Sequence, residues 1–419
     1  MDDHWFSAPF CVSNSNMNRL VYWVSPLLKH TARRLKLRFL CLVILLSVSF
    51  DFCHAGTPSQ EALESFLQKF CSDELEGRLI KQDSGKEACL MLETWLKENQ
   101  IQPLGAKDGS YLQPFSDGSN LIGVVYPKGQ EGKAPKILLT AHYDQYFMFG
   151  RPDKAEIENG AADNAAGVAV VLFALKAAAQ HIQAPVAVAL WSGRSCGEEG
   201  SLYFANNPTF PLEELGLMIE VDIVGLTFYP GFEKYTFAYG ADSGGEALLA
   251  DISEQSHGLK LLNLSQHIGR NWGRATSSFH RFKKPHVLFT DGRGSVDKSK
   301  YDKYESLDLA KVHLVQQMIT NLTIAASKPE RNYVYSLPDK SSLEDAYTLD
   351  YWLSEVRAFG AANNMDQATL VKLRKRMRTV KSIIDNESSS YNSYTRDSIN
   401  MVEEHSRSYM YKSKKKSTK

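Results

Sequence analysis

Residues 160–180 read GAADNAAGVAVVLFALKAAAQ, and this stretch sets the class of fold that the chain can form. From residue 165 onward it is almost wholly apolar, which predicts a helix that is buried against a sheet. Apolar strand-like runs lie on both sides of it, at 121–126, 137–141, 185–191, 217–224 and 286–290. Strands that alternate with helices of about 10–15 residues favour an α/β sandwich, in which helices cover a largely parallel central sheet.

Two further helices are expected beside this core. Residues 85–99 carry apolar side chains at helical spacing. Ser84 and Glu87 have the Ser-x-x-Glu spacing of a capping box, which predicts a helix start there. The second helix is expected at 305–327, where it closes the main domain.

The character of the sequence changes after residue 328. Helical spacing of apolar residues predicts helices at 343–359 and 366–384. The remaining faces of the second helix are strongly basic, and a Lys-rich tail follows at 412–419. We therefore expect a helical C-terminal extension at 329–419. Two interpretations of it stay open: a solvated helical hairpin packed on the main domain, or a docking element for a partner or an anionic surface.

The first 55 residues have the pattern of an export signal. Four basic residues between positions 33 and 38 precede an apolar run of twelve residues, 39–50. Twelve helical residues rise only ~18 Å, which is short of the ~30 Å hydrocarbon core of a membrane. With Ala55 before a cleavage point, the segment 1–55 is interpreted as a secretory signal peptide, or alternatively as an uncleaved membrane anchor. The mature chain, 56–419, is expected to be secreted or periplasmic, or membrane-anchored and facing outside.

The composition argues against a nucleic-acid partner and against a disulfide scaffold. Lys+Arg and Asp+Glu both number 48, so there is no basic surplus to neutralise the phosphates of a nucleic acid. A membrane partner is expected only through the N-terminal segment or the Lys-rich tail. Six cysteines in 419 residues are too few for a disulfide scaffold, so the core must rest on packing. Whether Cys71 and Cys89 are bonded is left open.

Metal-type side chains cluster where predicted elements end or begin. His142 and Asp144 come just past one strand, and Asp222 lies at the end of another. Asp163 lies at the mouth of the buried helix. Because α/β sheets carry their sites at the carboxyl ends of strands, we expect these side chains to lie close together. One imidazole and two carboxylates suit Zn²⁺ in a site that leaves one coordination position open.

Six motifs stand in the order SDELEGR at 72–78, YLQPF at 111–115, AHYD at 141–144, NGAADNAAG at 159–167, GSLYF at 200–204 and EVDIVG at 220–225. In these motifs the chain resembles the exported dinuclear zinc aminopeptidases, relatives of the glutaminyl cyclases and of the transferrin-receptor ectodomain. The resemblance implies a zinc-aminopeptidase-like domain at 56–328, in which His142, Asp163 and Asp222 hold one zinc ion. It also implies that Asp163 bridges to a second zinc ion and that Asp144 orients His142 from behind.

The chain departs from this family at the catalytic Glu-Glu pair. In the family the first Glu is the general base and the second Glu binds the second zinc ion. Laid on without gaps, the family pattern Glu-Glu-x-Gly-x-x-Gly-Ser-x-Tyr-Phe puts Arg194 and Ser195 at these two positions. Glu198 and Glu199 reach the two positions only with a four-residue shift that breaks the glycine spacing.

The last ligand of the second zinc ion is replaced as well, because Lys298 stands where the family has a His. The nearby His280 and His286 are expected to have core or surface roles. Arg cannot accept a proton at any relevant pH, and two cations at the site would repel a second Zn²⁺. We therefore expect one zinc ion per chain at most, or none.

Two functions compete on this evidence. The leading hypothesis is an exported aminopeptidase-like domain that has lost hydrolysis and acts as a binding or scaffold module for a peptide or protein. The alternative is an active metalloaminopeptidase that hydrolyses N-terminal peptide bonds with Glu198 and Glu199. A serine or cysteine hydrolase built on Ser195 or Cys196 is disfavoured, because 193–197 lacks the Gly-x-Ser-x-Gly spacing.

Overall fold

The computed structural model describes most of the chain beyond residue 59. The described residues are 60–106, 109–116, 118–145, 157–194, 199–265, 283–293, 299–336, 343–386, 398, 401–402 and 405–406. All of them belong to one compact unit, which spans 58–419. The predicted export segment, 1–55, lies outside the described residues.

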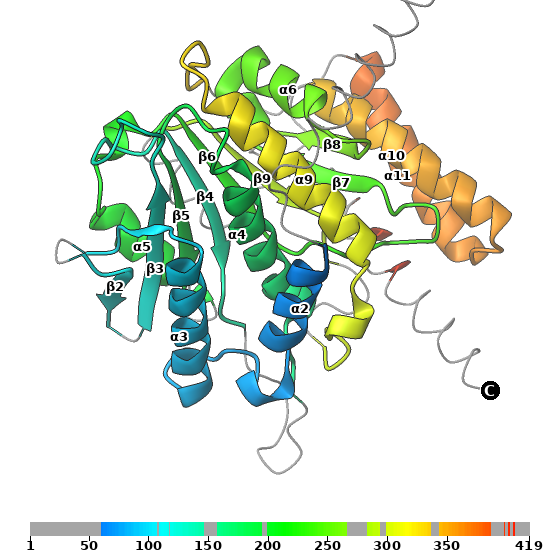
Figure 1. The fold of residues 1–419 in the computed structure, drawn as a ribbon. Coiled ribbons are helices and arrows are strands. Elements are labelled where there is room, and N and C mark those ends of the chain that lie inside the picture. Colours follow the sequence, from blue (N-terminus) through cyan, green and yellow to red (C-terminus); the bar gives the residue numbers. More distant parts are fainter. Residues whose placement is uncertain are drawn as a thin grey trace, which may run out of the picture. The chain divides into compact units, whose positions relative to one another are not determined.

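Within the described residues, the centre of this unit is a nine-stranded sheet (Figure 1). Its strands are β1 (Gln102–Pro103), β2 (Leu112–Phe115), β3 (Gly118–Val125), β4 (Ile137–His142), β5 (Val186–Trp191), β6 (Leu217–Val221), β7 (Tyr235–Tyr239), β8 (Lys260–Leu264) and β9 (His286–Thr290). They lie in the order β1-β3-β5-β4-β6-β9-β7-β8, and β2 also pairs with β3. The four middle strands, β5, β4, β6 and β9, run parallel to one another. The antiparallel pairs are at the sides, where β3 pairs with β5 and β7 pairs with β9.

Helices cover both faces of this sheet (Figure 1). They are α2 (Gln60–Phe70), α3 (Asp83–Glu98), α4 (Ala166–Ala178), α5 (Glu199–Asn206), α6 (Gly245–Glu254), α9 (Leu309–Ala326), α10 (Leu343–Ala362) and α11 (Gln367–Asp385). Successive residues of β9 point to opposite faces, as the period of a strand requires. Val287 and Phe289 belong to the core that contains α4 and α9, whereas Leu288 belongs to the core under α10. The predicted α/β sandwich with a helical C-terminal extension is confirmed.

Helix α4 is the buried apolar helix that the sequence predicts. Every residue of α4 except Lys176 is buried. Among the described residues, Ala161–Ala178 is the one helical segment long and apolar enough to cross a membrane, and 94% of it is buried inside the protein. It is therefore a core helix, packed against α9 and the parallel strands.

Three boundaries differ from the sequence-based expectation. Helix α3 begins at Asp83, so Ser84 lies inside the helix and is buried rather than capping its start. Helix α9 begins later than expected, because Asp308 caps it by accepting a hydrogen bond from the Lys311 N–H. Strand β6 ends one residue before Asp222, which therefore lies in the loop beyond the sheet. Several elements were not predicted, namely strands β1, β2, β7 and β8 and helices α2, α5 and α6.

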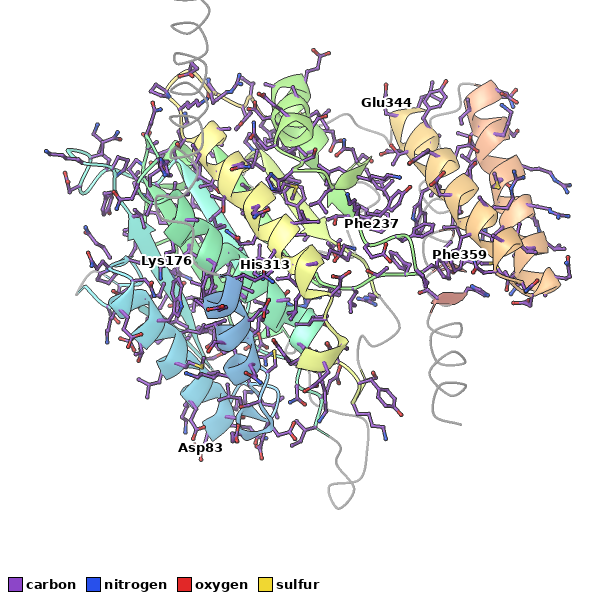
Figure 2. All side chains as sticks on the ribbon, turned by 45° about the vertical axis from the view of Figure 1, so that its right-hand side comes forward. Asp83, Lys176, Phe237, His313, Glu344 and Phe359 are labelled. Atoms are coloured by element: carbon purple, nitrogen blue, oxygen red, sulfur yellow. The ribbon has the colours of Figure 1, made fainter. Side chains whose placement is uncertain are left out.

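The C-terminal extension folds as two helices, α10 and α11, that pack side by side, and α10 also packs on β8. Figure 2 shows Glu344 at the start of α10 and Phe359 near its end. The Trp352 ring lies 5.8 Å from the ring of Phe228 and 5.2 Å from that of Phe237, centroid to centroid. The hairpin thus shares a hydrophobic core with β7. The predicted domain limits at 55/56 and 328/329 stay predictions.

Candidate metal centre

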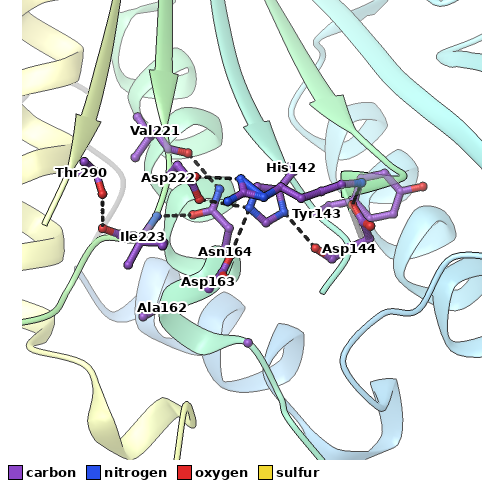
Figure 3. Close-up of polar contacts among 12 residues, drawn as sticks. His142, Tyr143, Asp144, Ala162, Asp163, Asn164, Val221, Asp222, Ile223 and Thr290 are labelled. Carbon is purple, nitrogen blue, oxygen red and sulfur yellow. Dashed lines mark hydrogen bonds and ion pairs between the residues drawn. The ribbon is translucent and has the colours of Figure 1, made fainter. Parts of the chain in front are cut away.

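His142, Asp163 and Asp222 meet at the carboxyl ends of β4 and β6 (Figure 3). His142 is the last residue of β4, and Asp222 is the first residue after β6. These strands are parallel neighbours, so their carboxyl ends lie side by side. Asp163 comes from the turn at 161–165 that leads into α4. The parallel sheet therefore brings together three residues that are far apart in sequence.

The three side chains lie close enough together to share one ion. His142 Nε2 lies 3.1 Å from an oxygen of Asp163 and 3.1 Å from an oxygen of Asp222. One ligand atom of each residue lies within 4.8 Å of those of the other two. Since zinc bonds to N and O ligands are about 2.0–2.1 Å long, neighbouring ligands of a tetrahedral ion lie about 3.3 Å apart. Among the described residues, no other group of His, Cys, Asp or Glu has this spacing.

The ring of His142 is fixed by its other nitrogen. Nδ1 donates to the main-chain oxygen of Asp144 at 2.9 Å, which turns Nε2 toward the two carboxylates. Asp144 thus lies behind His142, but its main chain rather than its carboxylate makes this contact. Burial and the guanidinium of Arg194 lower the pKa of His142, yet the two carboxylates outweigh both effects and raise the pKa to about 10.

A cation of the chain itself also reaches this site. Arg194 lies three residues beyond β5, the parallel neighbour of β4. Its Nη1 lies 2.8 Å from Asp222 Oδ2, and its side chain is 15% exposed. The main-chain N–H of Arg194 donates to the Asp144 carboxylate at 3.2 Å. The guanidinium therefore neutralises one of the two carboxylates that face His142.

The turn that carries Asp163 is held by another buried carboxylate, that of Asp302. Its two oxygens accept the main-chain N–H groups of Ala162 at 2.7 Å and of Asp163 at 3.1 Å. Burial raises the pKa of Asp302 to about 7, although these bonds favour the charged form. Sequence reasoning did not identify Asp302. The signal that could have found it is its place four residues after Lys298, the position where the family has its last ligand.

Arg78, the last residue of the SDELEGR motif, ties the site's loops to one another. It is fully buried and donates to the main-chain oxygens of Phe70 at 2.9 Å, Tyr143 at 2.7 Å, Asn159 at 2.7 Å and Gly160 at 2.9 Å. Tyr143 follows His142, and Gly160 precedes the turn with Asp163. Arg78 therefore joins the end of β4 to the start of that turn. The sequence shows SDELEGR as one of the family-like motifs, but its spacing does not predict this role of Arg78.

The loop with Asp222 is fixed from both sides. Asn164 accepts a hydrogen bond from the N–H of Ile223 at 3.1 Å and donates to the oxygen of Val221 at 2.9 Å. Ile223 has a left-handed backbone, with φ at 56°. A β-branched residue rarely adopts that conformation without surrounding constraints. The loop is thus held by contacts on either side of Asp222.

Four other predicted residues lie outside the described part of the chain: Ser195, Glu198, His280 and Lys298. Glu199 is the first residue of α5 and does not belong to the group of three ligand candidates. Its N–H donates to the Gly193 oxygen at 3.2 Å, and its Oε2 is buried without a hydrogen-bond partner. His286 is buried in β9 with its ring bonded to the Lys284 oxygen, so it has the expected core role.

The position and composition of this site agree with the comparison to known families. Residues 120–322 match Peptidase family M28, and all three ligand candidates lie inside this range. Residues 120–322 form an M28 domain. The resemblance seen in the sequence is therefore confirmed at the level of the family. A comparison with curated protein sequences gives no significant match.

Two solved structures of one aminopeptidase show the same fold. The Legionella pneumophila LapA aminopeptidase has a TM-score of 0.51 at 14% identity, over 65% of this chain and 73% of that chain. A second LapA structure gives a TM-score of 0.50 at 15% identity, over 64% and 74% of the two chains. The Porphyromonas gingivalis glutaminyl cyclase gives a TM-score of 0.49 at 16% identity, over 64% of this chain and 98% of the other.

The donor set of the M28 domain fits one zinc ion. An imidazole and two carboxylates are ligands that zinc prefers, and the two separations from His142 Nε2, 3.1 Å each, are close to those in a tetrahedral shell. Zinc binding at this site has to compete with Arg194. Asp222 can bind an ion with Oδ1, but its other oxygen is bonded to Arg194, whose charge repels the ion.

Proposed function

We propose that this chain is an M28-family domain that does not hydrolyse peptides and acts as a binding or scaffold module. One observation carries the proposal: the guanidinium of Arg194 lies 2.8 Å from Asp222, next to the candidate ligand His142. The gapless alignment puts this residue where the family has its general base. The proposal therefore assigns a fixed cation to the position where the family's carboxylate takes a proton from water.

The chemistry of the guanidinium argues against catalysis. A general base needs a free electron pair, and Arg stays protonated at every relevant pH. A bound zinc ion would supply a Lewis acid that polarises a carbonyl group and acidifies a water molecule. In this chain His142, Asp163 and Asp222 would hold that ion. Arg194, which contacts Asp222 beside them, cannot accept the proton of that water.

The metal content that we propose is one zinc ion per chain at most. In the metal-free site the two carboxylates already face two cations, the protonated ring of His142 and the guanidinium of Arg194. An incoming ion must displace the ring proton and share Asp222 with the guanidinium. This weakens zinc binding relative to a site with a carboxylate at position 194.

An active metalloaminopeptidase is the second candidate function. The buried and unbonded Oε2 of Glu199 favours it, since an unsatisfied carboxylate oxygen needs a partner. In that case Glu198 and Glu199 serve as base and ligand. The first function predicts no hydrolysis, whereas the second predicts hydrolysis that requires Glu198 and Glu199.

Export is part of the proposal and rests on the N-terminal sequence pattern. A secreted or periplasmic module would meet its peptide or protein partners outside the cytoplasm. N-terminal sequencing of the protein recovered from the culture medium or periplasm tests this part. A chain that begins at Gly56 agrees with it, and one that begins before residue 39 contradicts it.

A hydrolysis assay decides between the two functions. The purified chain is incubated with aminoacyl amides and with N-terminal glutaminyl peptides, with and without added zinc, and its metal content is measured. We expect no turnover above buffer. Zinc-dependent hydrolysis that disappears in Glu199→Ala, but not in the surface variant Glu213→Ala, would overturn the proposal. Under the proposal, activity is expected only after Arg194→Glu, Ser195→Glu and Lys298→His are combined.

A further inference from the structure

A charged groove of about 500 Å³ lies between the helices of the C-terminal hairpin. Four cations and two carboxylates line it, namely Arg357, Arg374, Arg378, Lys381, Asp350 and Asp385. The groove thus has a formal surplus of two positive charges, although the whole chain has none. It lies outside 120–322, so it is not part of the M28 site.

The carboxylates of α10 do not neutralise this groove. Helix α10 has four acidic residues, but Asp345 is buried and accepts the Ser265 N–H at 2.6 Å. Glu355 accepts the Tyr235 hydroxyl at 2.8 Å, on the side of β7. Of the four, Asp350 alone lines the groove. Three of the four acidic residues of α10 therefore lie outside the groove, which keeps its surplus of two positive charges.

Within the described residues, the three arginines of the groove are unpaired. Arg357, Arg374 and Arg378 are exposed, and none makes an ion pair or hydrogen bond in the described part of the chain. Lys381 pairs with Asp385 at 3.5 Å, with both side chains more than half exposed. Exposed pairs of this kind contribute little, so they do not bind the groove's cations firmly.

The arrangement of the guanidinium groups indicates the kind of ligand. Arg374 and Arg378 are one helical turn apart on α11, and Arg357 lines the same groove from α10. Each guanidinium is a planar fork of donors that fits two oxygens at a time. A phosphoryl group offers three outer oxygens to such forks, whereas a carboxylate offers two.

We propose that the groove between α10 and α11 binds a phosphoryl group, carried by a free phosphorylated molecule or by a lipid headgroup. The site gives the module a ligand that is independent of the metal centre. Phosphoryl binding in the groove and peptide hydrolysis at the metal centre are measured separately. The proposal for the groove can therefore fail while the proposed function holds, and the reverse.

The first test uses inorganic pyrophosphate as the probe. Calorimetric titrations compare the wild-type chain with Arg374→Gln/Arg378→Gln at low ionic strength, where charge interactions are screened least. The matched control is Lys372→Gln/Lys375→Gln, which removes the same charge from exposed positions of α11 outside the groove. We expect the groove variant to bind at least tenfold more weakly than wild type, and the control to stay within about twofold.

The second test distinguishes the source of the phosphoryl group. The same three proteins are sedimented with vesicles of phosphatidylglycerol and phosphatidylcholine, or of phosphatidylcholine alone. Arginine-dependent binding to the first vesicles identifies a lipid headgroup, and binding of pyrophosphate alone identifies a free ligand. All substituted side chains are exposed, so unchanged melting temperatures are expected, and Arg357→Gln on α10 provides a second groove variant.

Two results would overturn the proposal. One is a wild-type chain that binds neither pyrophosphate nor anionic vesicles. The other is an equal loss of binding in the groove variant and the control, because attraction by the net charge of α11 would then explain the binding without a site.

Discussion

Arg194 adds a positive charge to the candidate metal centre. Its guanidinium forms an ion pair with the carboxylate of Asp222, and a bound ion would use the same carboxylate. Replacement by Met keeps the side-chain length and removes the charge, so Arg194→Met is expected to bind zinc roughly tenfold more tightly, which corresponds to ~1.4 kcal/mol. Competition with a coloured zinc chelator measures this. Arg194→Lys keeps the charge and should stay near wild type; equal affinities in the Met and Lys variants would contradict the role given to the charge.

Arg78 is expected to be one of the most sensitive single residues for stability. Arg78→Met leaves four buried main-chain oxygens without their donor. The expected loss in free energy of unfolding is roughly 3–5 kcal/mol, as for other buried charged groups that lose a partner. Denaturant unfolding measures it, with the exposed Arg374→Met as control, for which a change within about 0.5 kcal/mol is expected. A small effect of Arg78→Met would mean that water replaces the donors.

The two cysteines left open by the sequence are free thiols. Burial raises the pKa of Cys71 to about 12 and that of Cys89 to about 11. Because the thiolate is the reactive form, both are expected to react slowly with iodoacetamide at pH 8, and Cys71 more slowly than the half-buried Cys89. Both rates should rise with pH. Peptide-resolved mass spectrometry measures them, and rapid native labelling of Cys71 would show that its surroundings open.

Site residues can be predicted from the sequence where a polar residue follows an apolar strand. His142 and Asp222 are polar residues at the ends of apolar strands, so they are visible as site candidates without a structure. Arg78 and Asp302 act by bonding main-chain groups of other segments. Which main-chain groups come near them depends on the packed fold, and no local spacing encodes it.

At the scale of elements, the loop after β6 is supported by a buried ion pair. Lys311 of α9 lies 3.0 Å from Asp291 Oδ1, and both side chains are at most 1% exposed. Asp291 also accepts the N–H groups of Gly225 and Leu226, and Lys311 donates to the Leu226 oxygen at 2.7 Å. Helix α9 thus holds the loop that begins at Asp222.

Lys311→Met is expected to cost roughly 3–5 kcal/mol near neutral pH, because it leaves the carboxylate buried without its counter-charge. Burial already raises the pKa of Asp291. Without Lys311 the folded-state pKa rises further, so folding favours the protonated form. The variant's stability should therefore fall as pH increases from the unfolded-state pKa, about 3.9, toward the folded-state pKa.

Urea unfolding at pH 5 and pH 8 tests this element, and the variant should lose more stability at pH 8. The double variant Asp291→Asn/Lys311→Met removes the titrating group, so its loss of stability relative to wild type should be equal at both pH values. A single variant that is equally destabilised at both pH values would show that lost packing, rather than the charge, is responsible.

The elements themselves were predictable to different degrees. Strands β4, β5, β6 and β9 are buried apolar runs, so the sequence indicates them directly. Strands β7 and β8 escaped notice, since β7 is rich in aromatic residues and β8 has the exposed Lys260 at its start. Their burial depends on Trp352 and its neighbours, about ninety or more residues further along the chain. Such a distant partner cannot be inferred from a local pattern.

For the molecule as a whole, the hairpin of α10 and α11 completes the sheet's second face. Phe228, Phe237 and Leu288 from the main part of the chain form one buried cluster with Trp352 and Leu353 of α10. Neither part can bury these surfaces alone. We therefore expect the main part and the extension to unfold together in a single transition.

Trp352→Ala tests this coupling, because the indole is 1% exposed and packs on two rings from outside the hairpin. Loss of a buried Trp side chain is expected to lower the free energy of unfolding by roughly 3–5 kcal/mol and to shift the whole transition to lower temperature. Tyr347→Ala, on the same helix but 56% exposed, is the matched control and should change stability by less than about 1 kcal/mol. Calorimetry together with circular dichroism follows both parts at once. If the Trp352 variant instead splits the unfolding into two transitions and moves only one of them, the extension is an independent domain, and the shared core does not bind it to the M28 domain.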